Sequence, residues 1–104
     1  MQFDIYANRN KDTNKVYPFF IDVQNDLLDS LNSRIVVPLT PRQSVTNPYP
    51  ENLCPQIELD NKHYLILSHQ ITSISVNMLK KQIGSVAEKR DEIIAAIDFL
   101  VTGI

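Results

Sequence analysis

The residue types that carry most enzyme chemistry are few in this sequence, and their spacing keeps them apart. The two histidines, His63 and His69, lie six positions apart in a segment that is typical of a strand, so about 20 Å would separate them and one metal ion could not bind both. Gly84 and Gly103 are the only glycines, whereas phosphate-binding loops need several glycines in one turn. The sequence has no Gly-x-Ser-x-Gly elbow for a serine nucleophile. We therefore expect no catalytic residue, no metal site and no cofactor.

The charge balance and the cysteine content indicate which classes of partner and which cellular compartment the sequence favours. Ten Lys and Arg against twelve Asp and Glu give a net charge of -2, which disfavours direct, tight binding to nucleic acid. Cys54 is the single cysteine, so an internal disulfide is excluded and a reducing, cytoplasmic location is expected. The longest apolar run, residues 93–101, is interrupted by Asp98, and neither a membrane span nor a secretory signal is expected. The 104 residues suit one domain.

Most of the chain before residue 84 alternates in polarity or is rich in β-branched residues, as strands are. Polar, proline-containing or aliphatic-poor segments at 8–15 and 40–52 predict loops. Pro38 and Pro41 are expected to end the third strand, and Asp60-Asn61 suits a two-residue hairpin turn. We expect a bulge or break near Thr72. The expected strands cover residues 2–5, 17–23, 34–39, 54–59, 62–68 and 71–79.

The period of the pattern changes after Gly84 from that of a strand to that of a helix. Ser85 and Glu88 have the spacing of a capping box, which predicts a helix start there. Gly103 follows the last periodic residue, where helices commonly end. The apolar positions at helical spacing are Val86, Ile93, Ile97, Leu100 and Val101.

These elements predict a mainly β fold, an antiparallel sheet or small open barrel with one C-terminal helix on one side. The strand at 62–68 is apolar on both faces, because Leu65 and Leu67 alternate with Tyr64 and Ile66. This pattern suggests that a second subunit covers one face, as in a homodimer. A barrel interior together with a covering loop of the same chain would explain it as well.

Five short stretches occur in order and at nearly unbroken spacing along the whole chain. They are Met1-Gln2-Phe3, the run from Phe20 to Asp26, the segment from Arg34 to Leu39, Leu53-Cys54-Pro55, and Gly103-Ile104. As an ordered set they resemble the CcdB toxins of bacterial toxin-antitoxin modules that serve plasmid maintenance. The resemblance implies a single CcdB-like domain over residues 1–104, with an SH3-like antiparallel barrel, a C-terminal helix and a two-fold homodimer.

The resemblance also implies how the protein acts. Such toxins are poisons rather than enzymes: they bind the A subunit of DNA gyrase and trap its covalent complex with cleaved DNA. In the family the gyrase contacts come from the end of the helix and from a short apolar insert after an Asp-Val-Gln run. Thr102 stands where the best-known members have a tryptophan. The corresponding positions here are Asn25, Leu27, Leu28, Asp98, Val101, Thr102, Gly103 and Ile104.

A cognate antitoxin is implied too, with a disordered segment that folds on binding. Family antitoxins contact loops that correspond to residues 8–15 and 40–52, although no individual contact can be assigned.

Two other functions stay open. Toxins of the MazF and Kid type use the same barrel to cleave messenger RNA, which needs a basic groove and an acid/base pair; the chain offers Arg9, Arg34, Arg42 and Arg90 with two histidines. A decayed copy would bind antitoxin only.

Overall fold

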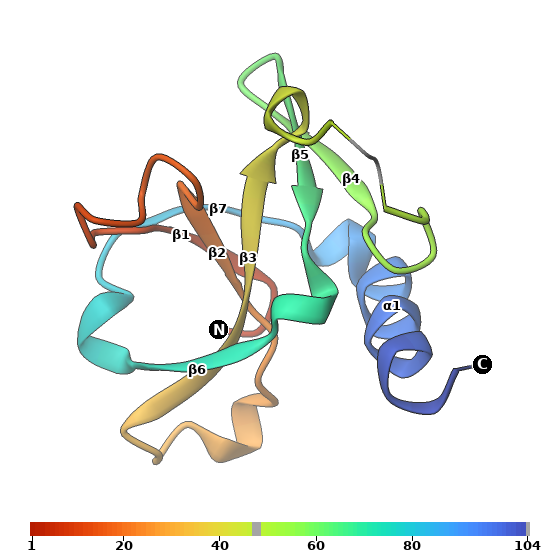
Figure 1. Cartoon of the computed structure of the whole chain (residues 1–104). Helices are drawn as coiled ribbons and strands as arrows, with labels where there is room; N and C mark the ends of the chain where they lie inside the picture. Colours follow the sequence, from red (N-terminus) through yellow and green to blue (C-terminus); the bar gives the residue numbers. More distant parts are fainter. Residues whose placement is uncertain (47–48, 104) are drawn as a thin grey trace.

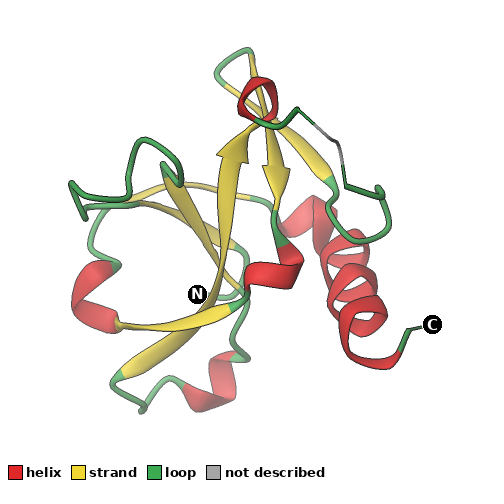
Figure 2. Ribbon diagram, in the orientation of Figure 1, coloured by secondary structure: helices red, strands yellow, loops and turns green. Residues whose placement is uncertain are grey.

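The computed structural model of the chain describes residues 1–46 and 49–103. Within this range, seven strands form one antiparallel sheet that curves into a half-barrel, and a single α-helix lies beside it (Figures 1 and 2). The strand order is β4-β5-β3-β2-β1-β7, and β6 also pairs with β3. The predicted fold class, mainly β with one C-terminal helix, is confirmed. The elements are β1 (Asp4–Ala7), β2 (Phe19–Asp22), β3 (Ser33–Pro41), β4 (Gln56–Leu59), β5 (Lys62–Ile66), β6 (Thr72–Ser75), β7 (Gln82–Ser85) and α1 (Arg90–Thr102).

Five short 3-10 turns connect these elements. They are η1 (Asp26–Leu28), η2 (Arg42–Ser44), η3 (Ser68–Gln70), η4 (Val76–Met78) and η5 (Ala87–Lys89). The predicted long loop at 40–52 thus begins with the end of β3 and includes one turn, η2. Over the residues that the structure describes, no helix combines the length and apolar character that a membrane span requires.

The first strand starts later than its alternation predicts. Phe3 has a positive φ of 69°, a conformation that a bulky residue adopts only when its surroundings impose it. Its side chain is buried, and its carbonyl accepts a hydrogen bond from the amide of Val86 at 2.8 Å. β1 therefore begins at Asp4, and the predicted strand at 2–5 is displaced towards Ala7.

The expectation that Pro38 ends its strand is wrong, because β3 continues to Pro41. The carbonyl of Pro38 accepts a hydrogen bond from the amide of Leu67 at 3.0 Å. In an antiparallel ladder the nitrogen and the carbonyl of one residue point to the same side, so the missing amide proton also faces the β5 side. There β3 changes partner: β6 pairs with it up to Val36 and β5 from Leu39. Pro38 occupies the gap between these two partners.

The hairpin of β4 and β5 is confirmed. Ile57 pairs with Tyr64 in its register, and Asp60 and Asn61 form the turn with φ of 51° and 65°. Both values lie in the left-handed region that a two-residue hairpin turn of this type needs and that Asn and Asp tolerate.

The segment after Ile71 differs from its prediction. The strand β6 ends at Ser75, whose hydroxyl accepts a hydrogen bond from the amide of Asn77 at 3.2 Å and so starts the turn η4. The expected strand through Leu79 is wrong beyond Ser75. The strand β7 was not predicted at all, because its edge position exposes Gln82 and Ile83 and leaves no alternation of buried and polar residues.

The predicted helix start is also wrong. Ser85 accepts a hydrogen bond from the amide of Ala87 at 3.2 Å rather than from that of Glu88, so the capping box does not form. The turn η5 follows, and α1 begins at Arg90. Its end is as predicted, because Gly103 has a φ of 74° and its amide donates to the carbonyl of Phe99 at 2.9 Å.

Two apolar clusters form the interior. The larger contains Ile5, Ile21, Val37, Leu39, Ile66 and Ile93, with neighbours from every layer of the fold. In the smaller cluster Leu65 and Leu67 pack with Cys54, and Tyr17, Val45 and Leu53 of the same chain cover them. From Tyr64 to Leu67 both faces are therefore buried within one chain, as the alternative of a covering loop predicted. A loop of the chain itself covers that face.

Truncation of Ile66 should test where the core lies. Ile66→Ala removes a side chain that is fully buried, and we expect a loss of about 2 to 5 kcal/mol in the free energy of unfolding. The matched control is Ile83→Ala, which is 43% exposed and should cost less than about 1 kcal/mol. Urea unfolding followed by circular dichroism measures both. Equal losses in the two variants would contradict this assignment of the core.

Candidate functional site

The predicted contact residues Asn25, Leu27 and Leu28 meet in one tight turn, η1. Asn25 Oδ1 accepts a hydrogen bond from the amide of Leu27 at 2.9 Å, and its carbonyl accepts from the amide of Leu28 at 3.0 Å. No residue of η1 is buried. Leu27 is 88% exposed and Leu28 49% exposed, so the apolar insert projects into solvent instead of filling the core.

Next to the η1 turn, Arg34 of β3 and Asp22 of β2 form a buried, two-pronged ion pair. Arg34 Nε donates to Asp22 Oδ2 and Arg34 Nη2 donates to Asp22 Oδ1, both at 3.0 Å. The two side chains are 7% and 2% exposed. Burial lowers the pKa of Arg34, but the hydrogen bonds and attraction of Asp22, and then of Asp29, outweigh burial and raise this pKa above its ordinary value. The guanidinium stays charged and fully engaged.

Gln24 connects this ion pair to the turn. Its side-chain amide donates to the carbonyl of Leu28 at 3.1 Å and accepts from the amide of Ile35 at 3.0 Å. Its own carbonyl accepts from Arg34 Nη2 at 3.1 Å. The stretch Asp22-Val23-Gln24, which contributed to the resemblance, therefore works as a structural connection between β2, the η1 turn and β3.

The second set of predicted contact residues lies at the C-terminal end of α1, from Asp98 to Gly103, which we call the helix end. Val101 is 75% exposed and Leu100 38% exposed, so the predicted apolar stripe of the helix is buried only further back, at Ile93 and Ala96. Thr102 is exposed, and its hydroxyl donates to the carbonyl of Asp98 at 2.7 Å. Ile104 lies outside the described residues.

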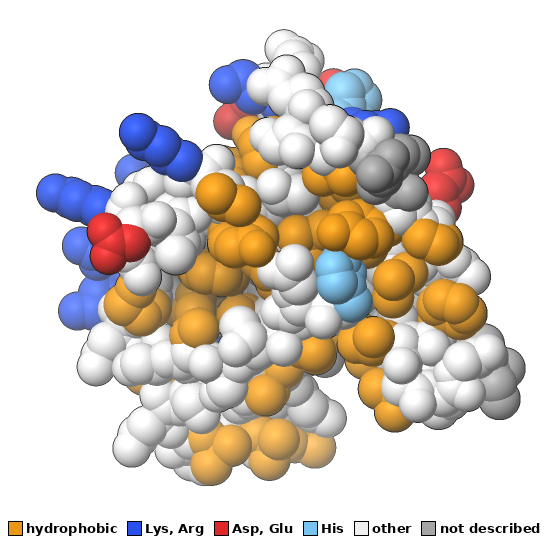
Figure 3. Space-filling model, in the orientation of Figure 1, with side chains coloured by type: hydrophobic (Ala, Val, Ile, Leu, Met, Phe, Trp, Pro, Cys, Tyr) orange, Lys and Arg blue, Asp and Glu red, His pale blue; other side chains and the backbone are white. Residues whose placement is uncertain are grey.

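One chain does not bring these two sets together. In Figure 1 the η1 turn lies at the lower end of the molecule and the helix end lies at the right, well apart in projection. Figure 3 shows, in the same orientation, exposed hydrophobic side chains at the lower end and no lysine or arginine around them. The two sets therefore form two separate surfaces of one chain.

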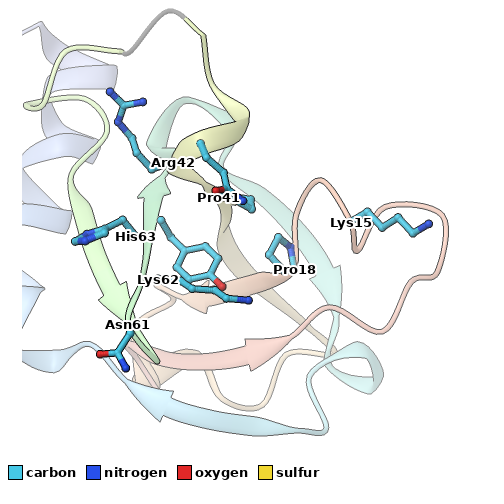
Figure 4. Close-up of a pocket in the computed structure, with 9 residues that line it drawn as sticks. Lys15, Pro18, Pro41, Arg42, Asn61, Lys62 and His63 are labelled. Carbon is cyan, nitrogen blue, oxygen red and sulfur yellow. The ribbon is translucent and has the colours of Figure 1, made fainter.

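The opposite end of this view carries a basic hollow, defined by Lys15, Arg42, Lys62 and His63 (Figure 4). Its volume is about 490 Å³, and Pro18, Pro41 and Tyr64 supply apolar walls. Of the described residues that line it, none is an aspartate or glutamate. Figure 4 shows Arg42 above the hairpin residues Lys62 and His63, whose side chains point to opposite sides, and Lys15 further out on its loop. Sequence reasoning missed this grouping because its members come from three separate segments.

Cys54 and His69, which the sequence left unconnected, are neighbours. Cys54 Sγ lies 3.5 Å from His69 Nδ1, and the His69 ring lies against that of Tyr49 with centroids 4.6 Å apart. Cys54 is buried, and burial raises the pKa of its thiol. The thiol is therefore neutral near pH 7 and suits a packing role more than that of a nucleophile. Within the described part of the chain, no group of three metal-ligating side chains forms.

The four arginines that an RNA-cleaving site would draw on do not gather. Arg34 is committed to its buried ion pair, and Arg90 lies at the start of α1 beside Asp91. Arg42 shares the basic hollow with His63, whose ring lies 3.9 Å from Glu58. Arg9 is in the polar loop before Tyr17. Among these four arginines, Arg42 is the one that lines a described hollow together with a histidine.

Three of the predicted contact residues, Leu27, Leu28 and Val101, are thus exposed aliphatic side chains on a small antiparallel half-barrel. The comparison with protein families identifies the class to which this fold belongs. The family model described as CcdB protein matches residues 2–103, nearly the whole chain. This protein therefore belongs to the CcdB family, a family of toxins from toxin-antitoxin modules that are protein poisons rather than enzymes.

Replacing one member of the buried ion pair should lower the free energy of unfolding more than replacing both members. Arg34→Leu leaves the buried carboxylate of Asp22 with only the exposed Met1 ammonium, at 3.4 Å, and we expect the free energy of unfolding to fall by about 3 to 5 kcal/mol. The double variant Asp22→Leu with Arg34→Leu removes both buried charges, leaves only the more exposed Asp26 and Asp29 without their cation, and should regain most of that loss. Urea unfolding of both single variants and the double variant gives the coupling energy. Purely additive effects would show that the two side chains do not depend on each other.

Proposed function

We propose that this chain is the toxin of its module and that it binds the A subunit of DNA gyrase and traps the complex with cleaved DNA. The observation that supports this most is the exposure of Leu27, 88%, on a turn that hydrogen bonds and a buried ion pair hold in place. An exposed leucine adds nothing to the folding stability of the protein, whereas it adds to binding affinity when a partner covers it. The family to which the chain belongs supplies the identity of the target.

The helix end adds the second contact. Val101 is 75% exposed, and Asp98 and Gly103 are exposed beside it. The C-terminal turn is closed by Gly103 and by the hydroxyl of Thr102, so Val101 has a fixed position. Two ordered aliphatic contacts lose little conformational entropy when a partner covers them.

Thr102 changes the chemistry of this contact. The family tryptophan stacks on a gyrase arginine, and the loss of such a stack costs about 1 to 2 kcal/mol. The hydroxyl of Thr102 is already bonded within the helix and offers no replacement. We therefore propose that Leu27, Leu28 and Val101 carry more of the gyrase affinity here than in members with tryptophan.

We further propose that the toxin acts as a two-fold homodimer. The η1 turn and the helix end lie apart in one chain, and a dimer would present each of them twice around one axis. A two-fold target such as the gyrase A dimer can then meet equal patches on both of its halves. Ile35, Val76 and Leu100 are exposed by 37 to 38%, and these aliphatic side chains are candidates for the contact between the two copies.

The antitoxin is proposed to use the other end of the molecule as well. Lys15, Arg42 and Lys62 border the basic hollow without an acidic residue among its described lining, in a chain whose net charge is -2. Carboxylates of a partner segment would pair with these cations, and Pro18 and Tyr64 would contact its apolar side chains. Arg42 and Lys15 fall in or beside the two loops that family antitoxins contact.

Serine substitutions of the two exposed aliphatic residues should weaken the poison without unfolding it. Leu27→Ser and Val101→Ser each remove a central contact, and we expect about tenfold more toxin to be needed for the same amount of trapped DNA. Purified gyrase, ATP and supercoiled DNA provide the assay, with linear DNA after protease treatment as its readout. Val16→Ser is the matched control, because Val16 is 54% exposed but lies outside both contact sets.

Two results would contradict the gyrase proposal. One is a wild-type chain that leaves gyrase unaffected and cleaves a messenger RNA in a parallel reaction, as the MazF and Kid toxins do. The other is a wild-type chain that binds its antitoxin and does neither, as a decayed copy would. Loss of trapping by Val16→Ser, at the same level as by Leu27→Ser, would place the contact surface elsewhere.

The charge of Arg42 should matter for the antitoxin and not for gyrase. Arg42→Gln removes one cation from the hollow, and we expect about fivefold weaker antitoxin binding together with a smaller dependence on salt. Titration calorimetry with the cognate antitoxin at two salt concentrations measures this. Arg90→Gln, at the start of the helix, is the control and should leave the affinity unchanged. Equal effects of the two substitutions would show that only net charge matters.

A further inference from the structure

The η1 turn has little of its own to keep it in shape. Its backbone hydrogen bonds, such as that from Asp29 to the carbonyl of Asp26 at 3.2 Å, are those of a single 3-10 turn, whose hydrogen-bond geometry is poor. No residue of the turn is buried. Apart from the cap that Asn25 Oδ1 gives the amide of Leu27, the position of Leu27 depends on tethers from outside the turn, of which the bond from Gln24 to the carbonyl of Leu28 is one.

Arg34 provides two such tethers, one from Nη1, which makes no hydrogen bond to Asp22, and one from Nη2, which Asp22 and Asp26 share. Arg34 Nη1 donates to Asp29 Oδ1, and Arg34 Nη2 approaches Asp26 Oδ1 at 3.4 Å. Asp26 Oδ1 also accepts from the amide of Gln2 at 2.9 Å. The turn is thus fixed at both of its ends, before Leu27 by Asp26 and after Leu28 by Asp29.

The two outer carboxylates differ from Asp22 in their surroundings. The side chain of Asp29 is 65% exposed and that of Asp26 is 41% exposed, whereas Asp22 is buried. Exposed ion pairs add little to folding stability. Asp29 fills no space in the core, and its contribution to stability is limited to accepting the one hydrogen bond from Arg34 Nη1.

We propose that Asp29 and Asp26 are positioning residues for gyrase: through Arg34 they hold the η1 turn in the conformation that presents Leu27. This inference rests on the proposed function. A turn that is already ordered in the free toxin loses less conformational entropy when gyrase covers it. Ordering of the free turn therefore increases the affinity for gyrase. Neither carboxylate has to touch the target for this effect.

Replacement of Asp29 separates positioning from stability. Asp29→Ala removes the acceptor for Arg34 Nη1, while the buried pair with Asp22 stays intact. We expect a small decrease in melting temperature, because Arg34 Nη1 loses its acceptor. We also expect faster amide hydrogen exchange confined to residues 26–31 of the free toxin, and about tenfold weaker binding to the purified gyrase A subunit. Asp29→Asn keeps an acceptor oxygen and should restore most of both properties. Asp12→Ala, in the exposed 8–15 loop, is the control and should change neither.

A double variant distinguishes positioning from direct contact. If Asp29 acts only through the placement of Leu27, Asp29→Ala has no further effect on gyrase affinity in a Leu27→Ser background. Full additivity of the two substitutions, or weaker binding with unchanged hydrogen exchange, would mean that the carboxylate touches gyrase and would overturn the inference. So would normal affinity of Asp29→Ala. Failure of the wild-type toxin to bind gyrase would instead refute the proposed function, and this inference with it.

Discussion

The buried pair of Arg34 and Asp22 is the constraint on which the rest of this structure depends. Two charges with side chains 7% and 2% exposed are tolerated in a small core only when their hydrogen-bonding groups are satisfied. Here the satisfying groups come from β2, from β3 and from the segment between them, because Arg34 also reaches Gln24, Asp26 and Asp29. The same hydrogen bonds that compensate the buried charges also hold the exposed, apolar η1 turn in one conformation.

The same interactions give the two ends of the molecule different chemistry. Around the η1 turn the carboxylates outnumber the single arginine, and their field is felt nearby: burial raises the pKa of Tyr6, and the negative charges of Asp4 and Asp22 raise it further. At the hairpin end the basic hollow has no acidic residue among its described lining. The net charge of -2 is therefore unevenly distributed, with several carboxylates around Arg34 and the η1 turn and with cations lining the hollow.

The sequence predicted most of the sheet because the signals there are local. Alternation gave β2 and β4, and Asp60-Asn61 identified the hairpin turn. The errors arose where tertiary pairing decides: Pro38 stays within β3 since its missing proton faces the gap between β5 and β6, and β7 forms only because β1 offers an edge. At the candidate site, the resemblance supplied Leu27 and Val101. It could not supply the ion cluster behind Leu27, because Asp26 and Asp29 have no pattern that marks them as partners of Arg34.

In the function proposed above, the η1 turn and the end of α1 form the surface that meets gyrase. Hydrogen exchange followed by mass spectrometry, on the toxin alone and with the purified gyrase A subunit, tests it most directly. The account predicts slower exchange at residues 25–31 and 98–103 in the complex and no change at the hairpin, residues 60–64. Protection confined to the hairpin and the basic hollow, with both predicted segments exchanging as in the free toxin, would contradict it.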